Sequence, residues 1–111
     1  MPEQSELSPE DRKLVTLARA TRARTGAAEG AAVRDLDGRT YAAATVDLAS
    51  LQVSAIGVCV AIAVASGSQG LEAVVVLGEA EAPSVEDLAV VREFAGEDTP
   101  VFSGDPRGNL R

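Results

Sequence analysis

The sequence predicts a single α/β domain of three layers, in which a mixed sheet of four to five strands has helices on both faces. The 111-residue chain is long enough for one domain. Its predicted elements follow the order helix, strand, strand, helix, strand, helix, strand, and an Asp-Gly step joins the first two strands as an antiparallel hairpin. We expect this domain over residues 8–104, after a disordered N-terminus at 1–7 and before a flexible tail at 105–111.

The first helix is expected over residues 8–24. Ser8 is a suitable N-cap, Pro9 suits the first helical position, and two acidic residues follow in the first turn. Apolar residues from Leu14 onward recur at helical spacing, and basic residues occupy much of the remaining surface. No aromatic residues are interleaved with the basic ones, so we interpret them as a solvated face rather than an anion site.

Two short strands are expected next, at residues 27–34 and 40–46. The Asp37-Gly38 step between them is a strong signal for a hairpin turn. The second strand is rich in alanine and has weak strand propensity, so its pairing must come from its context in the sheet.

A second helix is expected over residues 47–67. Its apolar residues leave no polar stripe, and a helix that is apolar all round is buried all round. One sheet of a chain this small cannot cover such a helix on every side. The pattern therefore predicts a homo-oligomer, formed through the helical segment 49–66.

The last three elements have clearer boundaries. The run at 72–78 is rich in β-branched residues, which is typical of a strand covered on both faces. Ser84 suits the N-cap of a third helix, which starts after Pro83 and ends at Gly96. A short strand is expected at 99–102.

Composition excludes several classes of function. The chain has no histidine and one cysteine, which excludes a disulfide framework, an ordinary zinc site and an imidazole base. A net charge of −7 argues against binding nucleic acid or an anionic membrane. The longest apolar stretch is too short to cross a bilayer and the N-terminus does not look like a signal peptide, so we expect a cytoplasmic protein.

Several segments together resemble one known family. Residues 27–32 (Ala-Ala-Glu-Gly-Ala-Ala) stand where that family has a Phe-x-Val-Gly-Ala-Ala strand, and residues 45–50 stand at its Asn-Val-Glu-Asn-Ala-Ser stretch. Pro83 and the Glu93-Phe94-Ala95 segment match the start and end of a later helix. In this order and spacing, residues 10–104 resemble the small cytidine deaminases, which are zinc-dependent. The resemblance implies the cytidine deaminase-like fold and a tetramer or a dimer.

The resemblance also implies that the family's chemistry is missing. Those enzymes hold zinc with a Cys or His and two further Cys, and a Glu transfers the proton. A gapless register places Ile56 at the first ligand and Val58 at that Glu, while Ser84 and Asp87 stand at the two later Cys positions. The chain thus resembles a degenerate member, for which we expect no metal and no cofactor.

Three residues near these positions have alternative interpretations. Ser84 and Asp87 share a helix face and could present two oxygens to a metal, but an N-cap and a first-turn acid explain both. Cys59 falls where the family has an Arg, and we expect a small buried apolar residue rather than a reactive thiol.

The same resemblance implies that most of the family's nucleoside-binding residues are replaced. The family's base-stacking Phe aligns with Ala27, and its sugar-binding Asn aligns with Thr45. Asp47 replaces a family Glu, so one acceptor for a ribose hydroxyl could remain. Asp47 is also a natural N-cap for the second helix, and we favour that interpretation.

Three functional hypotheses follow. The first, which we favour, is a non-catalytic cytidine deaminase-like protein that acts through its oligomer, an unknown protein partner or a small nucleoside-like ligand. The second is a working cytidine deaminase-type hydrolase with a non-standard site, for which Asp47, Glu86 and Asp87 are the candidate acids. The third is a structural or regulatory subunit of a hetero-oligomer.

Overall fold

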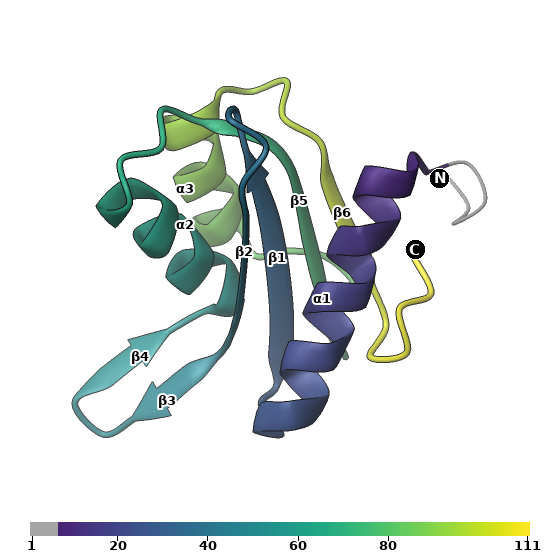
Figure 1. The fold of residues 1–111 in the computed structure, drawn as a ribbon. Coiled ribbons are helices and arrows are strands. Elements are labelled where there is room, and N and C mark those ends of the chain that lie inside the picture. The colour runs from purple at the N-terminus through teal and green to yellow at the C-terminus, as the bar shows by residue number, and fades with distance from the viewer. Residues whose placement is uncertain (1–6) are drawn as a thin grey trace.

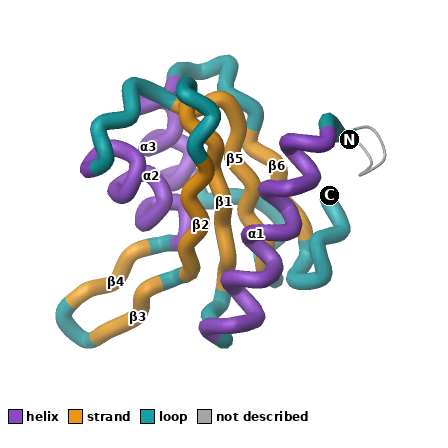
Figure 2. The backbone as a smooth tube through the Cα atoms, in the orientation of Figure 1, coloured by secondary structure: helices purple, strands orange, loops and turns teal. Residues whose placement is uncertain are grey.

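The computed structural model describes residues 7–111 (Figure 1). The disordered N-terminus predicted at 1–7 lies outside the described residues except for Leu7, which is buried. Within the described residues, four strands follow the first helix, and the remaining helices and strands alternate after them (Figure 2). Their bounds are α1 (Pro9–Thr25), β1 (Glu29–Asp35), β2 (Thr40–Ala44), β3 (Val46–Leu48), β4 (Leu51–Val53), α2 (Ala55–Ala65), β5 (Leu71–Gly78), α3 (Val85–Ala95) and β6 (Val101–Gly104).

The predicted three-layer architecture is confirmed. Four strands form one mixed sheet in the order β2-β1-β5-β6, in which β1 is antiparallel to both neighbours and β5 is parallel to β6. Helix α1 covers one face of this sheet, and α2 and α3 cover the other (Figure 1). Among residues 7–111, no helix is long and apolar enough to cross a membrane.

Helix α1 lies very close to the sheet because β1 carries a glycine beneath it. A Cβ atom added at Gly30 would lie 2.2 Å from the carbonyl oxygen of Ala18. The hydroxyl of Ser8 caps the start of the helix by accepting a hydrogen bond from the Asp11 amide at 3.0 Å. On this face the core is formed by small and branched residues of the helix and strands: Leu14, Val15, Ala18, Ala32, Ala73, Val75 and Leu77.

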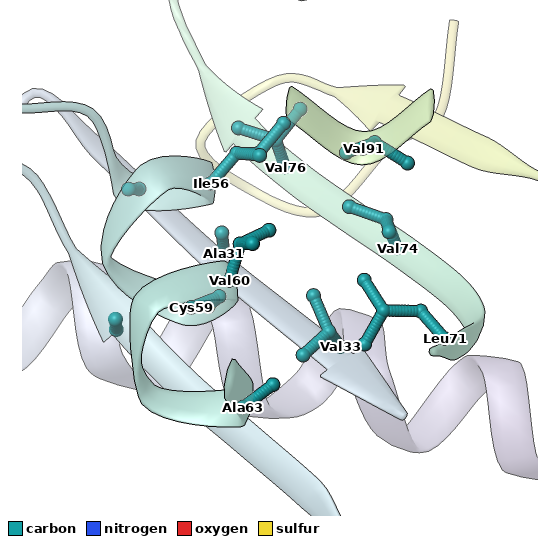
Figure 3. Packing of buried hydrophobic residues seen from close by; sticks show 12 residues of the cluster. Ala31, Val33, Ile56, Cys59, Val60, Ala63, Leu71, Val74, Val76 and Val91 are labelled. Atoms are coloured by element: carbon teal, nitrogen blue, oxygen red, sulfur yellow. The ribbon is translucent and has the colours of Figure 1, made fainter. Parts of the chain in front are cut away.

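The other face of the sheet holds the second core, between the strands and helices α2 and α3. Figure 3 shows its side chains, which gather from β1, α2, β5 and α3. The labelled members are Ala31, Val33, Ile56, Cys59, Val60, Ala63, Leu71, Val74, Val76 and Val91.

The start of the second helix was predicted wrongly. Helix α2 begins at Ala55, and the preceding residues form a separate antiparallel hairpin of β3 and β4. Ser54 is the N-cap, so the prediction that Asp47 caps this helix is also wrong, and Asp47 instead pairs with Gln52 across the hairpin. Residues 46–53 mix apolar side chains with Asp47, Ser50 and Gln52, and so short a segment does not distinguish strand from helix, whereas the capping hydroxyl of Ser54 does set the boundary.

The segment after β6 turns back along that strand. The Asp105 carboxylate accepts hydrogen bonds from the amides of Arg107 and Asn109, and the Arg111 amide donates to the Ser103 carbonyl at 2.8 Å. These bonds define a path for residues 105–111, while the flexibility predicted for them stays a prediction.

Candidate functional site

Helices α2 and α3 begin next to each other, and their N-caps are linked. The Ser54 hydroxyl accepts from the Gly57 amide at 3.0 Å and donates to the Asp87 carboxylate at 2.5 Å. The Ser84 hydroxyl accepts from the Asp87 amide at 3.0 Å. Asp87 therefore fastens the first turn of α3 to the first turn of α2.

The Asp87 carboxylate is buried without a cationic partner. Its residue is only 7% exposed, and both ion pairs among residues 7–111 involve Arg34 instead. The hydroxyl of Ser54 and the N-terminal dipole of α3 are what stabilise its negative charge.

A second carboxylate lies at this place, and sequence reasoning missed it. Glu29, at the start of β1, accepts a hydrogen bond from the Ala55 amide at the start of α2. Burial and the negative charge of Asp87 raise the pKa of Glu29. The available signal was a charged residue in a predicted strand, at a position where the family has Val.

The two residues that the predicted register places at the first zinc ligand and the catalytic Glu are apolar and partly or fully enclosed. Ile56 is completely buried in the core between α2 and the sheet (Figure 3). Val58 packs against the same core and also lines a surface groove between α2 and the β3–β4 hairpin.

The two residues considered for nucleoside binding are in different settings. The Thr45 hydroxyl accepts a hydrogen bond from the Glu29 amide at 3.0 Å, which places it beside the acidic pair. Asp47 lies exposed on the hairpin, opposite Gln52. Glu86, the third candidate acid, is exposed on α3. The structure thus groups Thr45, Glu29 and Asp87 and leaves the other two acids outside.

Cys59 is a buried apolar residue, as predicted. It has no exposed surface, and burial raises the pKa of its thiol to about 12. Its sulfur lies 3.8 Å from the Tyr41 carbonyl oxygen. A thiol with this pKa is not a nucleophile at neutral pH.

A comparison with protein-family models matches residues 7–108 to the model described as cytidine deaminase-like. The chain belongs to this family. The match covers nearly all of the described residues. Within residues 7–111, no group of three or more His, Cys, Asp or Glu side chains is arranged so that it could hold a metal ion.

Solved structures of bacterial cytidine deaminases have the same fold. The enzyme from Burkholderia pseudomallei is 24% identical, with a TM-score of 0.78 over 95% of this chain and 91% of that one. The enzyme from Mycobacterium leprae is 21% identical, with a TM-score of 0.70 over 94% and 93%. The Mycobacterium tuberculosis enzyme is 23% identical, with a TM-score of 0.70 over 94% and 91%. No curated protein sequence matches the chain.

Proposed function

We propose that this chain is a non-catalytic member of the cytidine deaminase-like family, which acts by association rather than by deamination. The observation that carries the proposal is the Ser54–Asp87 hydrogen bond at 2.5 Å. Through this bond the Asp87 carboxylate, at a position where the family has a zinc ligand, links the N-termini of α2 and α3. Ile56, at another ligand position, is part of the hydrophobic core.

The residues at the family's metal positions do not fit zinc. Protein zinc sites use Cys thiolates, His nitrogens and carboxylates. Here Asp87 is the one such donor, the neutral Ser84 hydroxyl caps a helix, and Ile56 has no donor atom. Val58 cannot move a proton in place of the catalytic Glu. These residues therefore support no reaction step at a zinc ion.

A residual hydrolase is the second candidate, because of Glu29. Its raised pKa, next to a second carboxylate, is a feature of general acid–base groups. The Ala55 amide already donates a hydrogen bond to this carboxylate, which leaves it less available as a base. Activity, if found, should therefore depend on Glu29 and Asp87 rather than on the exposed Asp47 or Glu86.

The proposed association is a homo-oligomer, dimer or tetramer, formed through α2 and the β3–β4 hairpin. No residue from 48 to 71 is charged, yet Leu48 is 60% exposed and Leu51 53%. An apolar groove of about 400 Å³ separates the hairpin from α2. Asp47 is the one charged residue of the hairpin and does not line the groove, so no charge in the groove opposes an apolar contact across a two-fold axis, and a second copy is the occupant we propose.

The interface can be tested without disturbing the core. Ile62 lies on the groove and is 37% exposed, so Ile62→Asp should dissociate the oligomer while leaving the fold intact. The matched control is Val85→Asp on α3, where the side chain is 79% exposed and outside this groove. Sedimentation velocity should show a smaller species for the first variant only. If both variants sedimented as species of the same size, the interface would not be at this groove.

The absence of zinc chemistry is tested by native mass spectrometry of untagged protein together with a cytidine deamination assay. We expect a zinc-free oligomer and no turnover. The variant I56C/V58E/S84C/D87C restores the family's residues and should take up one zinc per chain. One zinc per wild-type chain, or turnover abolished by Glu29→Gln, would overturn the proposal. A second, zinc-containing chain that co-purifies would instead indicate a subunit of a hetero-oligomer.

A further inference from the structure

A second apolar groove lies on the opposite side of α2, between that helix and α3. Its volume is about 350 Å³, and its lining comes from Val60 and Val64 on α2 and from Val90, Glu93 and Phe94 on α3. Val64 is 54% exposed and Val90 is 37% exposed. The two helices lie side by side on one face of the sheet (Figure 1), so the groove runs between their outward surfaces.

The two grooves beside α2 differ in charge. The groove against the hairpin is lined by apolar residues alone, whereas the α2–α3 groove has an acidic rim along α3. Glu93 lines it directly, and Glu86 precedes Val90 by four positions, which puts all three side chains on one face of the helix. Both glutamates are exposed, and the α2 side of the groove carries no charge.

We propose that the α2–α3 groove binds an amphipathic, basic helix of a partner protein. Apolar side chains spaced i, i+4 and i+7 would enter between Val64 and Val90, and Lys or Arg side chains would lie over Glu86 and Glu93. Helix α2 has eleven residues and is about 16 Å long, enough to hold about three turns of such a helix. This inference rests on the proposed function, because it names the partner through which a non-catalytic protein acts.

A second copy of this chain suits the groove less well than a separate partner does. The basic surface of the molecule is the outward face of α1, which carries Arg12, Arg19 and Arg24. The apolar residues exposed among them are Ala20 and Ala23, whose methyl groups are too small to fill the groove. The exposed leucines of this chain, such as Leu48 and Leu51, do not lie on the basic helix α1, so a helix that carries both leucine anchors and basic residues comes from another protein.

The test is fluorescence anisotropy with a labelled probe peptide. The probe has about fifteen residues of Ala and Lys, with Leu at i, i+4 and i+7. We expect it to bind the wild-type protein, and binding should weaken between about 50 and 300 mM NaCl. The double variant Glu86→Lys/Glu93→Lys should weaken binding about tenfold, since it reverses two rim charges. Val90→Ser should also weaken it, by removing apolar contact.

The matched control is Glu79→Lys/Glu81→Lys. It changes the net charge by the same amount but lies in the loop before α3, away from the groove. The control should weaken binding less than about twofold. Equal weakening by the two double variants would mean attraction to net charge only and would overturn the inference. So would equal binding of a probe with Glu in place of Lys, or salt-sensitive self-association abolished by Glu86→Lys/Glu93→Lys.

The two proposals fail separately. Zinc content and deamination are measured on the same wild-type preparation and involve neither Glu86 nor Glu93. A zinc-free, inactive protein that ignores the probe would overturn only the partner inference. A zinc-loaded, active protein would overturn the proposed function whatever the probe does.

Discussion

The two ends of strand β1 each hold a carboxylate, and the fold shifts the pKa values of the two in opposite directions. Asp35 at the end of the strand is 1% exposed and accepts hydrogen bonds from the hydroxyls of Ser68 and Tyr41 and from two amides. These donors, Ser68 foremost, lower the pKa of Asp35. Glu29 at the start has one amide donor and a second acid nearby, and its pKa is raised.

The difference shows that burial alone does not decide what a carboxylate does for the fold. With enough donors the charge is stabilised, and the group joins segments that lie far apart in the sequence. With few donors, burial and then the like charge of Asp87 raise the pKa of Glu29, and the folded state favours its protonated form. The unfavourable end of β1 is also the end beside Asp87, where the predicted register places one of the family's zinc ligands.

The strongest test of this comparison is to remove the favourable carboxylate. Asp35→Ala leaves two hydroxyls and two amides without their acceptor in a buried place, and we expect a loss of about 3 kcal/mol in the free energy of unfolding. Urea denaturation measures it. Asp37→Ala, on the same turn but exposed, should cost less than about 0.5 kcal/mol. Similar losses in both variants would mean that the turn, not the carboxylate, matters.

A smaller effect is expected at the other end, from Ser54→Ala. The change removes the N-cap of α2 and the bond to Asp87, which leaves a buried charge poorly solvated. The expected loss is about 2 kcal/mol. Ser50→Ala, in the exposed hairpin, is the matched control and should be near neutral. A loss below about 0.5 kcal/mol for Ser54→Ala would show that the link between α2 and α3 does not stabilise the fold.

The smallest effect should have the opposite sign. Because the folded pKa of Glu29 is raised, its contribution to stability is full below the unfolded value of 4.5 and is lost as pH rises through the folded pKa. Glu29→Gln keeps an acceptor for the Ala55 amide and removes the charge. It should stabilise the protein at pH 7, by about 0.5 kcal/mol since solvent screens this partly exposed group.

The pH dependence of that gain is the check. Urea denaturation near pH 4 should show little difference between Glu29→Gln and wild type, because both side chains are then largely neutral. Asp35 behaves in the reverse direction: its contribution is present above 3.8 and is lost as pH falls through its lowered folded pKa. Destabilisation by Glu29→Gln at pH 7 would contradict the repulsion between Glu29 and Asp87.

Much of the fold could be predicted from local signals. Ser8 and Ser84 are the N-caps of their helices, Asp37-Gly38 lies in the hairpin turn, and the β-branched run became β5. The second helix was misjudged because the apolar residues of 46–53 were joined to the apolar run 55–65, although Asp47, Ser50 and Gln52 interrupt the first segment. In that stretch Asp47 was predicted to be the cap, whereas Ser54 is the observed one, because the pairing of β3 with β4 delays the start of the helix.

The register that assigned the site residues stays a prediction. The register that placed Ile56, Ser84 and Asp87 depended on spacing along single helices, which a sequence preserves. The link from Ser54 to Asp87 and the approach of Glu29 to Ala55 join residues that are distant in the chain. Such contacts depend on how β1, α2 and α3 pack together, and no local pattern contains them.

Cys59 can report local opening of the core beneath α2. It is the only thiol in the chain, it lies against the Tyr41 carbonyl with no exposed surface, and a thiol reagent can reach it only when the core beneath α2 opens. The rate at which a thiol reagent labels Cys59 therefore measures how often α2 separates from the sheet. The effect of each substitution at either end of β1 on this opening can then be measured from the labelling rate of the Cys59 sulfur, without denaturant.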